Sequence, residues 1–244
     1  MKNIQKLSAN TLKIIGAIAM LIDHMGMILF PSVIAFRIIG RIAFPIFAFF
    51  IAEGARYTKN RIKHALLMLG VGLLCQVTVL VVTGEILINV LITFTMSTLL
   101  CYVLNDLKKS LFTDTSWQKR TFLSLLLALM IVGIYAINTV KRIEYGFVGC
   151  LLPLLASLNH MPSEAPDTIK RFDKVSISAL IMSVGTMLFA IDINIPVQFF
   201  ALFSLPILLT YSGKRGKMKM KYFFYIFYPT HLALLFGIAV LIIR

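Results

Sequence analysis

Six ionisable side chains lie within the first two apolar stretches of the chain, residues 12–54, where nearly every other residue would be comfortable in hydrocarbon. They are Lys13, Asp23, His24, Arg37, Arg41 and Glu53. An ionisable group inside a membrane-spanning helix is costly and marks a functional site by default. Histidine can accept a proton or carry an acyl group, and arginine can stabilise developing negative charge. The pattern therefore indicates chemistry inside a membrane.

Lys13 and His24 are eleven residues apart on the first apolar segment, which is about three helical turns. Their side chains therefore share one face, separated by about 16 Å along the helix axis. An acyl donor with a phosphate-bearing head at Lys13 and a thioester at His24 would fit this stripe. The plainer alternatives are that Lys13 snorkels to the membrane interface and that His24 makes a helix–helix hydrogen bond.

Asp23 lies about 100° around the helix from His24, so the two side chains cannot easily pair with each other. Arg37 and Arg41 share one face of the second segment, and Arg41 lies within about one turn of His24 in depth. We expect either a structural ion pair between Asp23 and an arginine, or an arginine that binds a carboxylate, a phosphate or the thioester oxygen. Glu53 is expected to pair with the basic loop after it.

The last apolar segment carries Pro229 and His231. Counting inward from Lys221 places His231 near the middle of the bilayer, about 15 Å deep, and Pro229 should loosen the helix just before it. His231 is therefore predicted to share a cavity with His24, unless it is a single satisfied core histidine. The chain has four histidines and no HExxH pattern, so no metal site is expected.

The composition places most of the chain in a bilayer. Of 244 residues, 59% are apolar and 14% are charged, whereas a soluble domain carries about 25% charged residues. The net charge of +14 is expected to serve membrane topology and anionic lipid, with no nucleic-acid partner. Cys75, Cys101 and Cys150 lie in or at the edge of apolar segments and are expected to pack as small apolar side chains.

Nine apolar spans are predicted, with ten as the alternative. They cover about residues 12–30, 33–55, 64–83, 86–105, 121–139, 145–158, 175–191, 195–211 and 222–243. With the N-terminus in the cytoplasm, the cytoplasmic segments, together with Lys13 at the cytoplasmic edge of the first span, hold 19 of the 24 Lys and Arg residues, which is the positive-inside pattern. The prediction is a single all-α polytopic membrane helix bundle over residues 1–244, in the cell's inner membrane, with 159–174 as the longest cytoplasmic loop.

Five blocks of the sequence resemble the TraX family, the family of the conjugal-transfer pilin acetylase. They read LSANTLKIIGAIAMLIDHMG, RIIGRIAFPIFAFFIAEG, NVLITF, EYGFVGCLLPLL and FYIFYPTHL. The first two and YPTHL are fairly specific, because they put ionisable residues inside apolar helices. The family is similar to membrane acyltransferases with an Arg/Lys-x10-His arrangement on the first helix. Here that arrangement is Lys13 to His24, with lysine rather than arginine.

The resemblance implies transfer of an acetyl group from cytoplasmic acetyl-CoA to an amine or hydroxyl acceptor, such as a peptide N-terminus. His24 would be the general base or a transient acyl carrier, and Asp23 or a neighbour would orient its imidazole. Arg37 and Arg41 would stabilise charge at the reacting centre, and His231 would line the same cavity.

The phosphates of acetyl-CoA would be held by Lys13, helped by Arg61 or Lys63. Two other function classes compete with an enzyme. Buried Asp, His and Arg residues also mark substrate paths in transporters and proton-coupled carriers, although no inverted repeat is evident. A non-catalytic scaffold would not explain why buried charge is concentrated in the first two spans.

Overall fold

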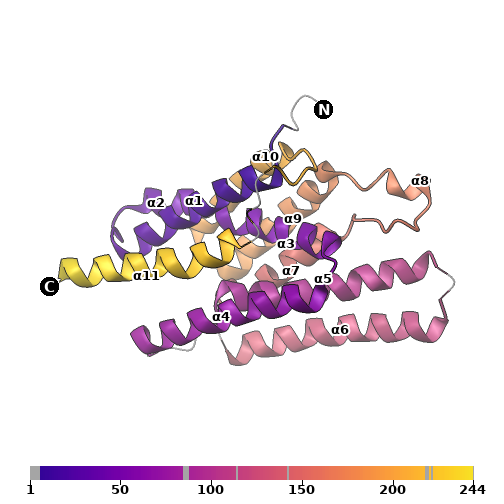
Figure 1. The fold of residues 1–244 in the computed structure, drawn as a ribbon, viewed down its shortest axis with the longest axis horizontal. Helices are drawn as coiled ribbons and strands as arrows, with labels where there is room; N and C mark the ends of the chain where they lie inside the picture. Colours follow the sequence, from indigo (N-terminus) through magenta and orange to yellow (C-terminus); the bar gives the residue numbers. More distant parts are fainter. Residues whose placement is uncertain are drawn as a thin grey trace. The chain divides into compact units, whose positions relative to one another are not determined.

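The computed structural model describes residues 6–84, 88–113, 115–141, 143–217, 220 and 222–243. Within these ranges the regular structure is helical, with two isolated β-bridges. The helices divide into two compact units (Figure 1). Unit 1 comprises Met1–Phe47 and Ile193–Arg244, and unit 2 comprises Ala48–Asp192. The helix α3 (Ala43–Tyr57) begins in unit 1 and ends in unit 2.

Unit 1 is built around its first helix. It contains α1 (Ala9–Ile28), α2 (Ile34–Gly40), the 3-10 helix η1 (Pro196–Phe203), α10 (Ser204–Leu209) and α11 (Phe223–Ile243). α1 packs against both α2 and α11, and α2 packs against η1. α1 begins after Ser8, whose hydroxyl accepts a hydrogen bond from the backbone N–H of Thr11 at 3.2 Å and so satisfies one of the open donors of the first turn.

The second predicted span is built from two helices. α2 ends at Gly40 and α3 begins at Ala43, although together they form one stretch long enough to span a membrane. Pro45 explains the break, because proline has no N–H to donate to the Arg41 carbonyl and its ring clashes with that carbonyl in a continuous helix. The break places Arg41 at the turn between the two helices.

Unit 2 is organised around a central helix. It contains most of α3, α4 (Arg61–Thr83), α5 (Val90–Leu111), α6 (Trp117–Val140), α7 (Gly146–Ser157), α8 (Asp167–Lys170) and nearly all of α9 (Val175–Ile193). α5 packs against α4, α6 and α7. Its buried Thr93 and Ser97 hydroxyls donate to carbonyls four residues earlier, at 3.1 and 3.0 Å, which allows polar side chains in an apolar core. The three cysteines are all buried, in agreement with a packing role.

Six stretches of the described sequence are long and apolar enough to cross a membrane: Ala9–Ile28, Ile34–Tyr57, Val90–Leu111, Trp117–Val140, Val175–Ile193 and Phe223–Ile242. Two further apolar stretches, Gly146–Ser157 and Pro196–Leu209, are shorter. α4 is not among these stretches, which were sought only among the described residues, and some of its side chains lie outside that part of the chain. On α6, Leu125, Leu129 and Val132 are 62–69% exposed, a surface suited to lipid. The protein is therefore an all-α bundle with the helices of a multi-pass membrane protein, and nine spans remains a prediction.

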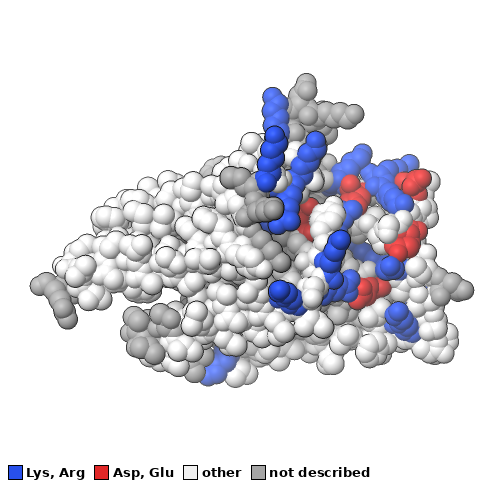
Figure 2. Space-filling view, in the orientation of Figure 1, with Lys and Arg blue, Asp and Glu red and all other residues white. Residues whose placement is uncertain are grey.

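Loops that were predicted to share one side of the membrane do lie together within each unit. In unit 1, the N–H groups of Ala9 and Asn10 donate to the carbonyls of Lys214 and Arg215, at 2.8 and 3.1 Å. In unit 2, residues from the loops after the second, fourth and sixth predicted spans line one pocket. Figure 2 shows the charged side chains of the visible face beside broad uncharged surfaces. The cytoplasmic location of these loops remains a prediction.

Candidate active site in unit 1

Asp23 binds both arginines of the next helix. Its Oδ1 atom accepts from Arg41 Nη2 at 2.9 Å, and its Oδ2 atom lies 3.0 Å from Arg37 Nη1. Arg37 Nη1 also donates to the Asp23 backbone carbonyl at 3.2 Å. The predicted pairing of Asp23 with an arginine of the second span is thus confirmed, and it involves both arginines. Because Asp23 is only 9% exposed, two nearby cations are what makes a buried carboxylate tolerable.

Two glycines allow α1 and α2 to approach closely enough for this contact. A Cβ atom added to Gly40 would lie 2.2 Å from the Asp23 Cβ atom, and one added to Gly26 would lie 2.5 Å from the Phe36 Cβ atom. Small residues at such positions are the usual means by which membrane helices pack closely. The sequence therefore positions the ion pair with glycines as much as with the charged residues.

Arg41 is the more completely engaged of the two arginines. Its Nε atom donates to the Arg37 carbonyl at 3.2 Å, and its Nη1 atom donates to Gln198 Oε1 at 3.0 Å. The Arg41 side chain is 11% exposed, whereas that of Arg37 is 30% exposed. Gln198, brought in by η1, is 1% exposed, and its Nε2 atom has no hydrogen-bond partner among the described residues. By sequence alone Gln198 is a weak candidate, because a glutamine in an apolar segment does not reveal its partner.

His24 and His231 meet side by side, as the sequence suggested. Nδ1 of His24 lies 2.7 Å from Nε2 of His231, and Nδ1 of His231 lies 2.7 Å from the Phe227 carbonyl oxygen. The two residues are 8% and 5% exposed. The Phe227 ring stacks on the His231 ring at a centroid distance of 4.8 Å. The hydrogen-bond partner that orients the His24 imidazole is therefore His231, whereas Asp23 binds the arginines.

The three residues predicted to hold phosphates lie in different surroundings. In unit 1, Lys13 Nζ lies 5.9 Å from the centre of the Phe224 ring, in a cation–π arrangement. In unit 2, Arg61 Nη1 donates to Asp106 Oδ2 at 2.6 Å. Lys63 is exposed on the first turn of α4, where its backbone N–H donates to Asn60 Oδ1 at 2.8 Å. Their joint action on one ligand remains a prediction.

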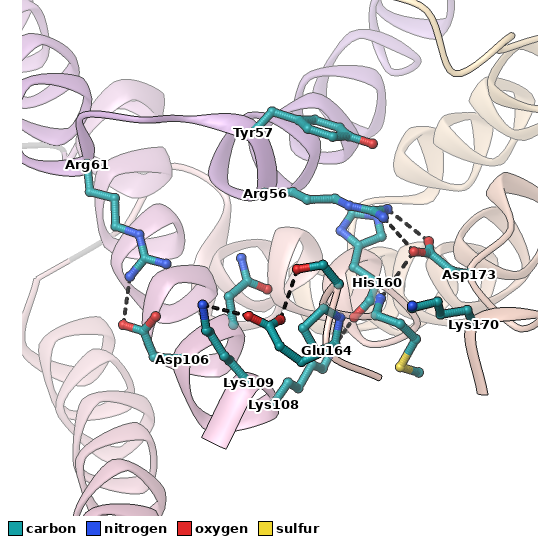
Figure 3. Close-up of a pocket in the computed structure, with 14 residues that line it drawn as sticks. Arg56, Tyr57, Arg61, Asp106, Lys108, Lys109, His160, Glu164, Lys170 and Asp173 are labelled. Atoms are coloured by element: carbon teal, nitrogen blue, oxygen red, sulfur yellow. Dashed lines mark hydrogen bonds and ion pairs between the residues drawn. The ribbon is translucent and has the colours of Figure 1, made fainter. Parts of the chain in front are cut away.

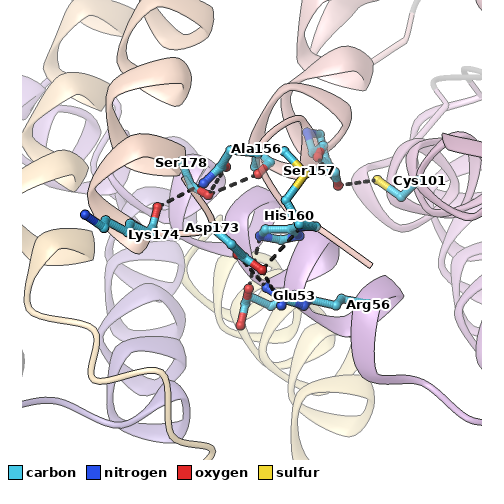
Figure 4. A network of polar contacts seen from close by, with 12 residues as sticks. Glu53, Arg56, Cys101, Ala156, Ser157, His160, Asp173, Lys174 and Ser178 are labelled. Atoms are coloured by element: carbon cyan, nitrogen blue, oxygen red, sulfur yellow. Dashed lines mark hydrogen bonds and ion pairs between the residues drawn. The ribbon is translucent and has the colours of Figure 1, made fainter. Parts of the chain in front are cut away.

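Unit 2 holds a second polar network, drawn in Figure 4. Glu53 Oε1 lies 3.2 Å from His160 Nε2, and Arg56 donates to both carboxylate oxygens of Asp173, at 2.9 and 2.5 Å. His160 and Asp173 were not singled out from the sequence, because they lie in a hydrophilic loop where such residues are ordinary. Among the described residues no group of three or more His, Cys, Asp or Glu side chains could hold a metal ion.

The chain was compared with known proteins. Over 162 residues the chain is 29% identical to an uncharacterized protein of Rickettsia prowazekii (strain Madrid E), a match that covers 61% of this chain and 62% of that protein. The chain therefore spans less than two thirds of the length of this curated relative. No solved structure matches the chain significantly. Residues 8–239, which include all the residues of the cluster above, match the family described as TraX protein, and the chain belongs to that family.

Proposed function

We propose that this protein is an integral membrane acyltransferase that transfers an acetyl group from cytoplasmic acetyl-CoA to an amine or hydroxyl acceptor, such as a protein N-terminus. The TraX family membership and the buried ionisable cluster of unit 1 support the proposal. The single observation that carries the mechanism is the hydrogen-bond chain from Phe227 through His231 to His24.

The direction of this chain follows from its carbonyl end. The Phe227 oxygen can only accept, so the Nδ1 atom of His231 carries the proton of that 2.7 Å contact. With both rings neutral, His231 Nε2 is then an acceptor, and His24 Nδ1 donates to it. The lone pair of His24 is left on Nε2. A fixed tautomer with a basic Nε2 atom is what a general base requires.

In the proposed reaction, Nε2 of His24 removes a proton from the acceptor amine as the amine nitrogen attacks the thioester carbonyl carbon. The C–S bond breaks when the tetrahedral intermediate collapses, and CoA leaves as a thiolate. The thiolate takes the proton from Nε2, so the products are an amide and free CoA thiol. His24 returns to its starting tautomer without a net change of charge.

Arg37 is the arginine better placed to meet substrate. Its side chain is 30% exposed, whereas Arg41 donates hydrogen bonds to Asp23, Gln198 and the Arg37 carbonyl. We assign Arg37 to the developing negative charge of the thioester oxygen. Arg41 and Asp23 then hold Arg37 in position, with Asp23 balancing both cations.

The test is a thiol-release assay on purified protein in proteoliposomes, supplied with acetyl-CoA and a panel of amine and hydroxyl acceptors. His24→Ala should lower acetyl-dependent CoA release by about 10²- to 10⁴-fold, the usual contribution of a general base. His64→Ala is the matched control, since His64 contacts Tyr102 at 2.8 Å in unit 2 and has no part in the mechanism.

Two results would count against the proposal. Equal CoA release by the His24→Ala and wild-type proteins would remove the general base. Substrate flux across the liposome membrane without any thiol appearing would favour the transporter alternative, in which the same buried charges form a translocation path.

A further inference from the structure

A charged pocket in unit 2 contains none of the residues given a role in the reaction steps at His24. Its volume is about 570 Å³, within the range of roughly 300–1,000 Å³ for small-molecule sites. Its walls come from the end of α3, the start of α4, the end of α5 and the segment after α7 (Figure 3). Five Lys or Arg and three Asp or Glu residues line it. The lining thus has two more cations than carboxylates, and one of these cations, Lys170, also pairs with Asp167 outside the lining at 3.5 Å. A phosphate group carries up to about two negative charges at neutral pH.

Some of the charged residues that line the pocket make hydrogen bonds that hold its walls together. Arg56 makes a two-point contact with Asp173, which also accepts a hydrogen bond from the Met161 N–H at 3.3 Å. Lys108 Nζ donates to the carbonyls of Ser157, Leu158 and His160, at 2.5, 2.8 and 3.1 Å. Because an ammonium group has three donors, Lys108 is fully engaged in holding the end of α7.

Two other cations, Arg61 and Lys109, face solvent in ion pairs, and the Arg61 guanidinium also lies 5.1 Å from the centre of the Tyr102 ring. Arg61 and Asp106 are 41% and 42% exposed, and Lys109 and Glu164 are 58% and 29% exposed. Exposed pairs of this kind contribute little to stability. The hydrogen bond from Lys109 also holds the pKa of Glu164 below its ordinary value, so the partner of Lys109 is an ionised carboxylate. A phosphate could therefore replace either carboxylate at low cost, and arginine suits it especially well.

An unpartnered buried nitrogen lies in the same pocket wall. His160 is 5% exposed, and its Nε2 atom faces Glu53. Its Nδ1 atom is buried and has no hydrogen-bond partner among the described residues. Buried polar atoms in native proteins nearly always have a partner. His160 therefore brings one buried nitrogen with unused hydrogen-bonding capacity to the wall of the pocket.

An exposed aromatic ring completes the lining. Tyr57 is 64% exposed, and the Arg56 guanidinium lies 5.2 Å from the centre of its ring. Nucleic-acid bases stack on aromatic side chains of this kind because every base has a π face. An aromatic ring beside exchangeable cations favours a phosphorylated nucleotide over a phosphate group alone.

From these observations we infer that the pocket binds a phosphorylated nucleotide, with Arg61 and Lys109 on the phosphates and Tyr57 on the base. This assignment rests on the proposed function, under which the ligand is the phosphorylated adenosine head of acetyl-CoA. An anionic phospholipid headgroup offers the same phosphate chemistry without the base.

The experiment measures CoA binding by calorimetry to the full chain in nanodiscs of neutral lipid, with pantetheine as the phosphate-free probe. CoA should bind at least tenfold more tightly than pantetheine. Arg61→Gln and Lys109→Gln should each weaken CoA binding about 5- to 10-fold, the loss of one charge-assisted contact. Lys119→Gln removes one exposed charge outside the pocket and should leave CoA affinity within about twofold. Tyr57→Leu should weaken binding of CoA but not of inorganic pyrophosphate.

Each contrary result overturns a defined part of the inference. Unchanged CoA affinity in both Arg61→Gln and Lys109→Gln would refute the pocket. Loss of CoA binding in phosphatidylglycerol nanodiscs, with no effect of Tyr57→Leu, would assign the pocket to a lipid headgroup. Normal CoA binding without acetyl transfer to any acceptor would refute the proposed function and leave the pocket intact. Acetyl transfer whose KM for acetyl-CoA is unchanged in the pocket variants would refute the pocket alone.

Discussion

Asp23 in unit 1 and Asp106 in unit 2 both pair with arginine, but in different surroundings. The Asp23 side chain is 12% exposed and binds two arginines, one of them 11% exposed. Asp106 and its partner Arg61 are 42% and 41% exposed. A buried carboxylate cannot lose its cations without leaving an unpaired charge in an apolar medium, whereas water can replace an exposed partner. The ion pairs of Asp23 therefore fix geometry in unit 1, whereas water can replace either partner of the exposed Arg61–Asp106 pair in unit 2.

The sharpest test of this contrast removes one carboxylate from each unit. Asp23→Ala should lower the free energy of unfolding by about 3–5 kcal/mol, because it leaves two arginines without their buried partner. Asp106→Ala should lower it by about 0–1 kcal/mol. Denaturant unfolding of both variants in one detergent measures the difference. If Asp23→Ala cannot be purified, Asp23→Asn serves instead, and equal effects at the two sites would remove the distinction.

The histidine chain of unit 1 predicts an ordered series of activities. His231→Ala should lower kcat about 10²-fold, close to 2.7 kcal/mol, with little change in KM, because the His24 ring loses its fixed orientation. His231→Gln should recover part of the rate, since its amide oxygen can accept from His24 Nδ1. Steady-state kinetics on acetyl-CoA measures both variants. A purely structural role for His231 would predict no difference between the two variants at equal stability.

Replacing a glycine by alanine should change the stability of the protein in opposite directions in the two units. Gly40→Ala should destabilise the protein by about 1–3 kcal/mol, as overpacking does, because the new Cβ atom would lie 2.2 Å from the Asp23 Cβ atom. Gly70→Ala should stabilise α4 by up to about 1 kcal/mol, since among the described residues no atom beyond the adjacent residues and the local α4 backbone lies within 4 Å of the new Cβ atom. Thermal unfolding of the two variants tests this, and a shift of the same sign in both would contradict it.

The adjacent lysines of α5 give the smallest and most local comparison. Lys108→Met removes three hydrogen bonds to carbonyls at the end of α7 and should cost about 1–2 kcal/mol. Lys109→Met breaks only the exposed pair with Glu164 and should change stability by less than about 1 kcal/mol. Unfolding free energies of the two variants, measured in the same detergent, test this difference. Equal losses would show that the pair at Lys109 is also structural.

Several features of the candidate site were accessible from local sequence patterns. Arg37 and Arg41 share a helix face because they are four residues apart, and their depth matched that of Asp23, so the pairing could be predicted. The break before Ala43 was not predicted, since residues 33–55 are predicted as one span, although Pro45 interrupts hydrogen bonding to residue 41. The depth of His231 made its meeting with His24 a reasonable hypothesis.

Other features depended on contacts that no local pattern encodes. His160, Gln198 and Asp173 were missed or ranked low, because one polar residue in a loop or apolar segment does not name its partner. That Asp23 would bind both arginines, and that His231 rather than Asp23 would orient His24, depended on how closely α1, α2 and α11 pack.

The sequence alone determined the membrane class and the apolar helices, and it named the ionisable residues that make up the candidate site. These follow from hydropathy, helical periodicity and the cost of charge in lipid, which act over a few residues. The tertiary structure alone decided which donor meets which acceptor. The contact between His24 and His231 joins residues 207 positions apart, and its geometry is set by helix packing to within a fraction of an ångström, a scale that residue spacing cannot specify.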